Sequence, residues 1–192
     1  MNNHLHIYRE LNSRFRLNTL TLGGSAALKL RGLLPHREVG DLDLLIGGSE
    51  WNDNAPFRLF VKALMNLQPV ANCYYPYPYQ PLGENIHNVK KHYRFKLDGI
   101  DICLFVIDTE SLNMRRRQYV YKRHSYQTDS VSMIAHAKRQ YVDRLARGET
   151  NELHKVRQRV NYTSPLLKSL YKHTQDLLLI EAALKENPNI TI

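Results

Sequence analysis

The chain has 192 residues, which suits one domain, or one domain with a small helical addition, and allows a core that needs no disulfide or metal. No run of residues is apolar enough to span a membrane, and the N-terminus lacks the apolar segment of a signal peptide, so we expect a cytoplasmic protein without a membrane partner. The 27 Lys and Arg against 18 Asp and Glu give a net charge of +9. Such an excess favours polyanions, although solubility alone explains it equally well.

The first part of the chain predicts helices mixed with short strands. Leu5, Tyr8, Leu11 and Phe15 recur at helical spacing, so residues 3–16 are expected to form an amphipathic helix. In chain order we then expect a strand at 20–22, a helix at 26–33, a strand at 41–46 and a helix from Pro56 to about residue 67.

Two apolar runs, 89–97 and 100–107, are separated by Asp98-Gly99, which is a strong hairpin signal. From about residue 130 the pattern becomes helical, with helices expected at 131–145, 149–160 and 165–185. The sequence therefore predicts an α/β (α+β) catalytic core over residues 1–128 and a C-terminal helical region over 129–192.

Asp41-Leu42-Asp43 carries the strongest chemical signal. Side chains alternate along a strand, so Asp41 and Asp43 lie on one face, with Cα atoms roughly 6.6 Å apart, and Leu42 lies on the other. Two carboxylates so close repel one another unless a cation neutralises them. Magnesium, or manganese, is a hard ion that takes such oxygen ligands and retains phosphate oxygens in its shell. The alternative is a solvated strand end.

Asp101 lies in a strand that is otherwise apolar on both faces, Ile100-Asp101-Ile102-Cys103-Leu104. A carboxylate there is costly unless it is paired or bound to metal. If this strand lies beside 41–46, the three acids converge on one site; the alternative is a pair with a lysine of the hairpin. Cys103 is expected to be a small buried side chain.

Gly23-Gly24-Ser25 stands between a strand and a helix. Glycines allow the backbone to approach an anion closely, free N–H groups point from the start of a helix, and the Ser25 hydroxyl can donate. The segment therefore predicts a triphosphate-binding turn; taken alone, a plain turn and cap is the commoner explanation.

Gly24-Ser25, Asp41-Leu42-Asp43 and Asp101 together resemble the DNA polymerase beta-like nucleotidyltransferase superfamily. Within it, Gly-Gly-Ser-Ala-Ala-Leu and Arg37, four residues before Asp41, resemble the abortive-infection (type IV) toxin nucleotidyltransferases and their uncharacterised relatives. The resemblance covers about residues 18–107 and implies a mixed sheet flanked by helices. It also implies Asp41, Asp43 and Asp101 as catalytic metal ligands, and Gly23, Gly24, Ser25 and Arg37 as nucleotide-binding residues.

Lys138 occupies the apolar stripe of its predicted helix, in a segment that resembles a lysine-bearing helix of the same relatives. Lysine is rarely buried unpaired, so we expect Lys138 to reach a polar cleft and bind the triphosphate; extension of its amine to solvent is the alternative.

The expected activity is transfer of a nucleoside monophosphate from an NTP, such as ATP, to an acceptor hydroxyl, with loss of pyrophosphate. The basic charge makes RNA, including tRNA, the expected acceptor, and the resemblance allows a toxin with a protein antitoxin. The alternative is a catalytically inactive protein of the same fold that binds nucleic acid or a partner protein. The Tyr/Pro loop 74–81 and the basic clusters 90–92 and 115–117 are weaker candidates for nucleic-acid contact, and the nine histidines show no metal-ligand spacing.

Overall fold

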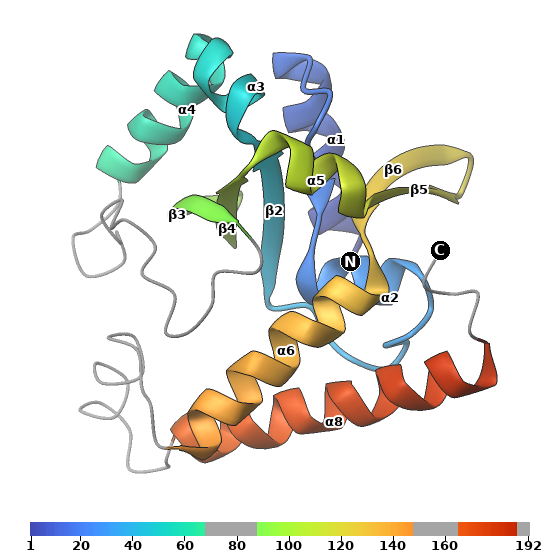
Figure 1. Ribbon diagram of the computed structural model, residues 1–192. Coiled ribbons are helices and arrows are strands. Elements are labelled where there is room, and N and C mark those ends of the chain that lie inside the picture. The colour runs from blue at the N-terminus through green and yellow to red at the C-terminus, as the bar shows by residue number, and fades with distance from the viewer. Residues whose placement is uncertain (68–87, 148–164, 188–192) are drawn as a thin grey trace. The chain divides into compact units, whose positions relative to one another are not determined.

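The computed structural model describes residues 1–67, 88–147 and 165–187 (Figure 1). The chain divides into two compact units, Met1–Asp129 and Ser130–Ile192. The helix expected at 149–160 and the Tyr/Pro loop 74–81 lie outside the described residues. Within the described ranges, no helix has the length and apolar character that crossing a bilayer requires.

The first unit is built on a six-stranded sheet with the order β3-β4-β2-β1-β6-β5. The strands are β1 Thr21–Leu22, β2 Asp41–Gly47, β3 Val89–Leu97, β4 Ile100–Ile107, β5 Arg116–Tyr121 and β6 His124–Asp129. β2 pairs with β4, and β1 with β6, in parallel, whereas the other pairs are antiparallel. The predicted mixed α/β architecture is confirmed.

The hairpin of β3 and β4 turns at Asp98 and Gly99, as the sequence predicted. Both residues have positive φ angles, 50° and 76°, which the type I′ turn of a two-residue hairpin requires. This tight turn fixes the register of β3 on β4, and β4 lies against β2 on its other side.

The helices of this unit that the structure describes are α1 Asn2–Phe15, α2 Gly24–Leu30, α3 Gly48–Asp53, α4 Ala55–Asn66 and α5 Thr109–Arg115. Trp51 of α3 packs against Tyr93 of β3, with ring centroids 4.8 Å apart, on the face of the sheet that also carries Leu42 and Leu44. Both leucines are fully buried. Leu112 of α5 instead joins the cluster around Leu45, on the opposite face. Most of the apolar core therefore lies on the face opposite Asp41 and Asp43.

The sequence analysis did not predict α3, α5, β5 or β6. β5 reads Arg-Arg-Gln-Tyr-Val-Tyr and none of its side chains is fully buried, so it lacks the apolar alternation by which a half-buried strand is recognised. It lies at an edge of the sheet and is held by its pairing with β6.

The second unit contains α6 Val131–Ala146 and α8 Pro165–Glu186, which pack against each other. Lys138 of α6 donates from Nζ to Oδ2 of Asp176 at 2.8 Å, and both side chains are buried. Beside this pair, Tyr141 meets His173 edge to face with ring centroids 4.8 Å apart. A buried ion pair of this kind favours one register of the two helices, since removing one partner of a buried pair is costly.

Candidate active site

Parallel pairing of β2 with β4 brings the acidic residues to one face of the sheet. Asp41 is the register partner of Asp101, and Asp43 is the register partner of Cys103. Paired residues in neighbouring strands point to the same face, so all four side chains share it. Two segments some 60 residues apart in the sequence thus lie side by side in the sheet.

Asp41, Asp43 and Cys103 each offer a ligand atom, and these atoms lie within 4.8 Å of one another. The two aspartates are half-buried and Cys103 is buried. Burial raises the pKa of the Cys103 thiol well above its ordinary value, and the Asp43 carboxylate raises it further. The sequence predicts Cys103 only as a small buried side chain. Its position two residues after Asp101, on the same strand face, is the signal for its place beside the acids.

The glycine turn lies directly against Asp43. The N–H of Gly23 donates to the carbonyl oxygen of Asp43 at 2.9 Å, and Gly24 has a φ of 52°. A Cβ added to Gly24 would stand 1.8 Å from Oδ2 of Asp43, and one added to Gly23 would stand 2.6 Å from a methyl of Leu45. Only glycine therefore fits at position 24, on grounds of both conformation and space. Ser25 follows as a buried residue in the first turn of α2.

Arg37 and His4 lie near Asp41, and Lys29 lies beside Arg37. The Nζ of Lys29 donates to the carbonyl oxygen of Arg37. Burial lowers the pKa of the Arg37 guanidinium, and the nearby Asp41 carboxylate opposes that shift. His4 of α1 is 7% exposed and, in the described part of the chain, neither ring nitrogen has a hydrogen-bond partner. Burial lowers the pKa of His4, the N-terminal amine adds to that, and Asp41 opposes it. The sequence predicts only Arg37 at this position, because no spacing rule links α1 or Lys29 to it.

Asp101 faces the same side as Asp41 but has cationic neighbours of its own. One carboxylate oxygen lies 3.8 Å from an Arg94 guanidinium nitrogen and the other lies 3.7 Å from Lys96 Nζ, both on β3. The contact with Lys96 matches the alternative reading of the sequence, a pair between Asp101 and a hairpin lysine. Register therefore places the Asp101 backbone beside Asp41, while its carboxylate forms contacts with β3.

Lys138 belongs to the second unit, where its amine is paired with Asp176. This pair satisfies a buried lysine without a triphosphate. The nucleotide-binding role of Lys138 stays a prediction.

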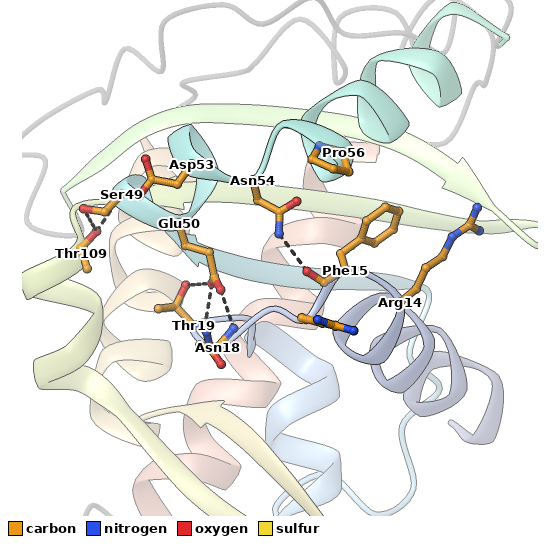
Figure 2. Close-up of a pocket in the computed structure, with 11 residues that line it drawn as sticks. Arg14, Phe15, Asn18, Thr19, Ser49, Glu50, Asp53, Asn54, Pro56 and Thr109 are labelled. Carbon is orange, nitrogen blue, oxygen red and sulfur yellow. Dashed lines mark hydrogen bonds between the residues drawn. The ribbon is translucent and has the colours of Figure 1, made fainter.

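A separate hollow of about 660 Å³ opens near the C-terminal end of α1 and α3 (Figure 2). Glu50 spans it and accepts hydrogen bonds from the backbone N–H groups of Asn18 and Thr19 and from the Thr19 hydroxyl. On its rim, the Thr109 hydroxyl donates to that of Ser49 at 3.1 Å. None of the predicted site residues lines this hollow, and its polar groups brace the segment that enters β1.

This chain has the nucleotidyltransferase fold. In its mixed sheet, a strand, a glycine turn and a helix are followed by an acidic pair on the next strand. Its structure is similar to that of a candidate nucleotidyltransferase from Thermotoga maritima, with a TM-score of 0.50 and 14% identity over 83% of this chain and 94% of that one. An antigenic nucleotidyltransferase-like protein from Paracoccidioides brasiliensis aligns with a TM-score of 0.35 and 14% identity, covering 96% of this chain and 87% of its own. No protein-family model matches the chain, and no curated protein matches it.

Proposed function

We propose that this protein is a metal-dependent nucleotidyltransferase that transfers a nucleoside monophosphate from an NTP to an acceptor hydroxyl and releases pyrophosphate. The observation that carries the proposal is the contact between the Gly24 backbone and the Asp43 carboxylate, next to Asp41. A turn that admits no side chain, placed against a pair of acids, is what binding a polyphosphate beside a cation requires.

A divalent cation fits this site. Asp41 and Asp43 would hold it, since their carboxylates lie close together and oxygen ligands suit Mg²⁺ and Mn²⁺. Bound there, the ion would neutralise phosphate oxygens and make the acceptor hydroxyl a better nucleophile. Asp101 is proposed as a further ligand or as the base that takes the acceptor proton, from the neighbouring strand of the same face.

The other residues of the chain would bind and orient the nucleotide. The Gly23-Gly24 turn would let the backbone approach the phosphates, the N–H of Gly24 and the hydroxyl of Ser25 would hold them, and Arg37 would neutralise them. The catalytic contribution of these groups is positioning and charge stabilisation, because phosphoryl-type transfer needs little covalent work from the protein. Lys29, whose amine contacts the Arg37 carbonyl, supports a cationic environment for the triphosphate.

RNA, including tRNA, is the acceptor that we propose, on the basis of the net charge of +9. A toxin whose activity is blocked by an antitoxin protein is compatible with this activity. Expression in a bacterial host, with the Asp43→Ala protein as the comparison, tests the toxin role: growth arrest by the unsubstituted chain alone supports it.

The transferase proposal is tested by incubating the protein with each of the four labelled NTPs, Mg²⁺ or Mn²⁺, and total RNA or total protein. We expect label to enter RNA, and Asp41→Ala and Asp43→Ala to abolish the transfer. Asp53→Ala is the matched control, because Asp53 is an exposed acid lining the separate hollow. Transfer that survives in both site variants would overturn the proposal. Absence of transfer and of metal binding, with RNA binding retained, would favour the inactive binding protein instead.

A further inference from the structure

The free edge of the sheet at β5 carries a run of cations. Residues 116–124 read Arg-Arg-Gln-Tyr-Val-Tyr-Lys-Arg-His and contain no acid. β5 is the last strand of the sheet, and Lys122 and Arg123 form the exposed tip of the hairpin that joins it to β6. An extended edge is a surface along which another chain can lie.

Two helices add cations to the same surface. Arg9 of α1 lies with a guanidinium nitrogen 3.0 Å from Nε2 of His124, and Arg31 of α2 lies over the Tyr119 ring, 5.7 Å from its centroid. Within the described residues, no carboxylate forms an ion pair with Arg9, Lys122 or Arg123. We name this surface the basic edge and define it by Arg9, Arg31, Arg117, Lys122 and Arg123.

The turn at the tip has a conformation that its residues do not favour. Tyr121 pairs with His124, so Lys122 and Arg123 are the two central residues of a two-residue hairpin, with φ angles of 47° and 66°. Such a type I′ turn is normally occupied by Asn-Gly, because left-handed angles are costly for long side chains. Two cations therefore occupy a turn that Asn-Gly would form with less backbone strain. Backbone strain that is retained in this way points to a function for the side chains.

Aromatic rings alternate with the cations along β5. Tyr119 and Tyr121 are half-exposed, and the Lys122 amine lies 5.4 Å from the Tyr121 ring centroid. Arginine and lysine neutralise phosphates, while tyrosine faces stack on bases. This combination suits a nucleic-acid strand better than an acidic protein or an anionic membrane, which present no bases.

We propose that the basic edge is a binding surface for the sugar–phosphate backbone and unstacked bases of a nucleic acid. Strand pairing places Tyr119 on the face of the sheet opposite Asp43, so this surface is separate from the candidate active site. The identity of the bound strand as the acceptor rests on the proposed function. Binding of the strand does not, because it needs neither NTP nor metal.

The test replaces the tip by the pair that its turn favours. Lys122→Asn with Arg123→Gly removes two charges and relieves the left-handed strain, so the folded state is kept and its thermal midpoint stays equal or rises. Lys62→Gln with Lys185→Gln is the matched control, because it removes the same net charge from two exposed lysines elsewhere. Fluorescence anisotropy with labelled single-stranded RNA, duplex RNA and single-stranded DNA is measured in EDTA without NTP, over a range of salt concentrations.

We expect the tip variant to bind single-stranded RNA roughly five- to twenty-fold more weakly at about 0.1 M salt. The slope of the log of the binding constant against the log of the salt concentration should become shallower by about 1.4, since each lost phosphate contact removes about 0.7. The control should change affinity less than about twofold. Equal losses in both variants, or no loss in the tip variant, would overturn the proposal. So would tip-dependent binding to phosphatidylserine vesicles without binding to any of the three nucleic acids. Because the assay contains no NTP, a failure of catalysis does not affect it.

Discussion

Gly24 lies so close to Asp43 that the backbone of the glycine turn and the carboxylate on β2 occupy adjoining space. A single Cβ at position 24 would overlap Oδ2 of Asp43 at 1.8 Å. The glycine turn and the acidic pair are therefore one structural element, and a change in either one must displace the other.

Gly24→Ala is expected to disturb the acidic pair as well as the turn. The positive φ alone costs an alanine about 1 kcal/mol, and the clash with Asp43 adds about 1–3 kcal/mol of overpacking. Urea unfolding should show the combined loss, and calorimetry should show weaker Mn²⁺ binding. Gly32→Ala is the control, because Gly32 has a φ of 79° but no atom within 4 Å of the added Cβ. If both variants lose stability and Mn²⁺ affinity equally, the contact with Asp43 has no special role.

Asp43→Asn should remove metal binding while leaving the fold intact, since the amide matches the carboxylate in shape but cannot supply its charge. For the unsubstituted protein, Mn²⁺ at about 100 times its Kd should add about 2.7 kcal/mol to the free energy of unfolding. We expect this gain to disappear in Asp43→Asn and to persist in Asp53→Asn, measured by thermal unfolding with and without Mn²⁺. A gain that persists in Asp43→Asn would place the ion elsewhere.

His92 should make the fold sensitive to mild acid. Its ring stacks on Phe105 with centroids 4.4 Å apart, and burial lowers its pKa from 6.5 to about 4. The folded state favours the neutral ring, so the contribution of His92 to the free energy of unfolding is complete above pH 6.5. This contribution is lost as the pH falls towards 4, and the loss amounts to at most about 3 kcal/mol. His92→Phe keeps an aromatic ring for stacking but removes the titration.

Urea unfolding at pH 7 and pH 4.5 measures this effect. We expect the free energy of unfolding to fall less between the two pH values in His92→Phe than in the unsubstituted protein. His36→Gln controls for the loss of a histidine, since His36 is exposed. Equal acid sensitivity in His92→Phe and in the unsubstituted protein would show that His92 does not carry it.

Arg115 and Asp129 form a buried ion pair that holds α5 to the end of β6. Arg115 Nε donates to Asp129 Oδ1 at 2.7 Å, and a second guanidinium nitrogen donates to Oδ2. Arg115→Met leaves a buried carboxylate without this partner and should cost about 3–5 kcal/mol in the free energy of unfolding. Adding Asp129→Asn should recover part of that loss, because it removes the buried charge that Arg115 neutralised. A further loss of stability would show that the two residues act independently.

The sequence alone determined the local part of this structure. Alternation along a strand placed Asp41 and Asp43 on one face, and Asp98-Gly99 fixed the turn between β3 and β4. Helix signals at Asn54 and Pro165 gave the starts of α4 and α8. These features depend on backbone geometry within a few residues, which each residue type sets by itself.

Only the tertiary structure decided which distant residues meet. The pairing of β4 with β2, and not with another strand, brought Asp101 beside Asp41 and the unanticipated Cys103 beside Asp43. Helix packing brought His4 near Asp41. Strand order and register arise from burial of the whole apolar face, to which every element contributes, so no local pattern contains them. The polar edge strand β5 was not predicted for the same reason. Its backbone is held as a strand by its pairing with β6, and its own side chains carry no strand pattern.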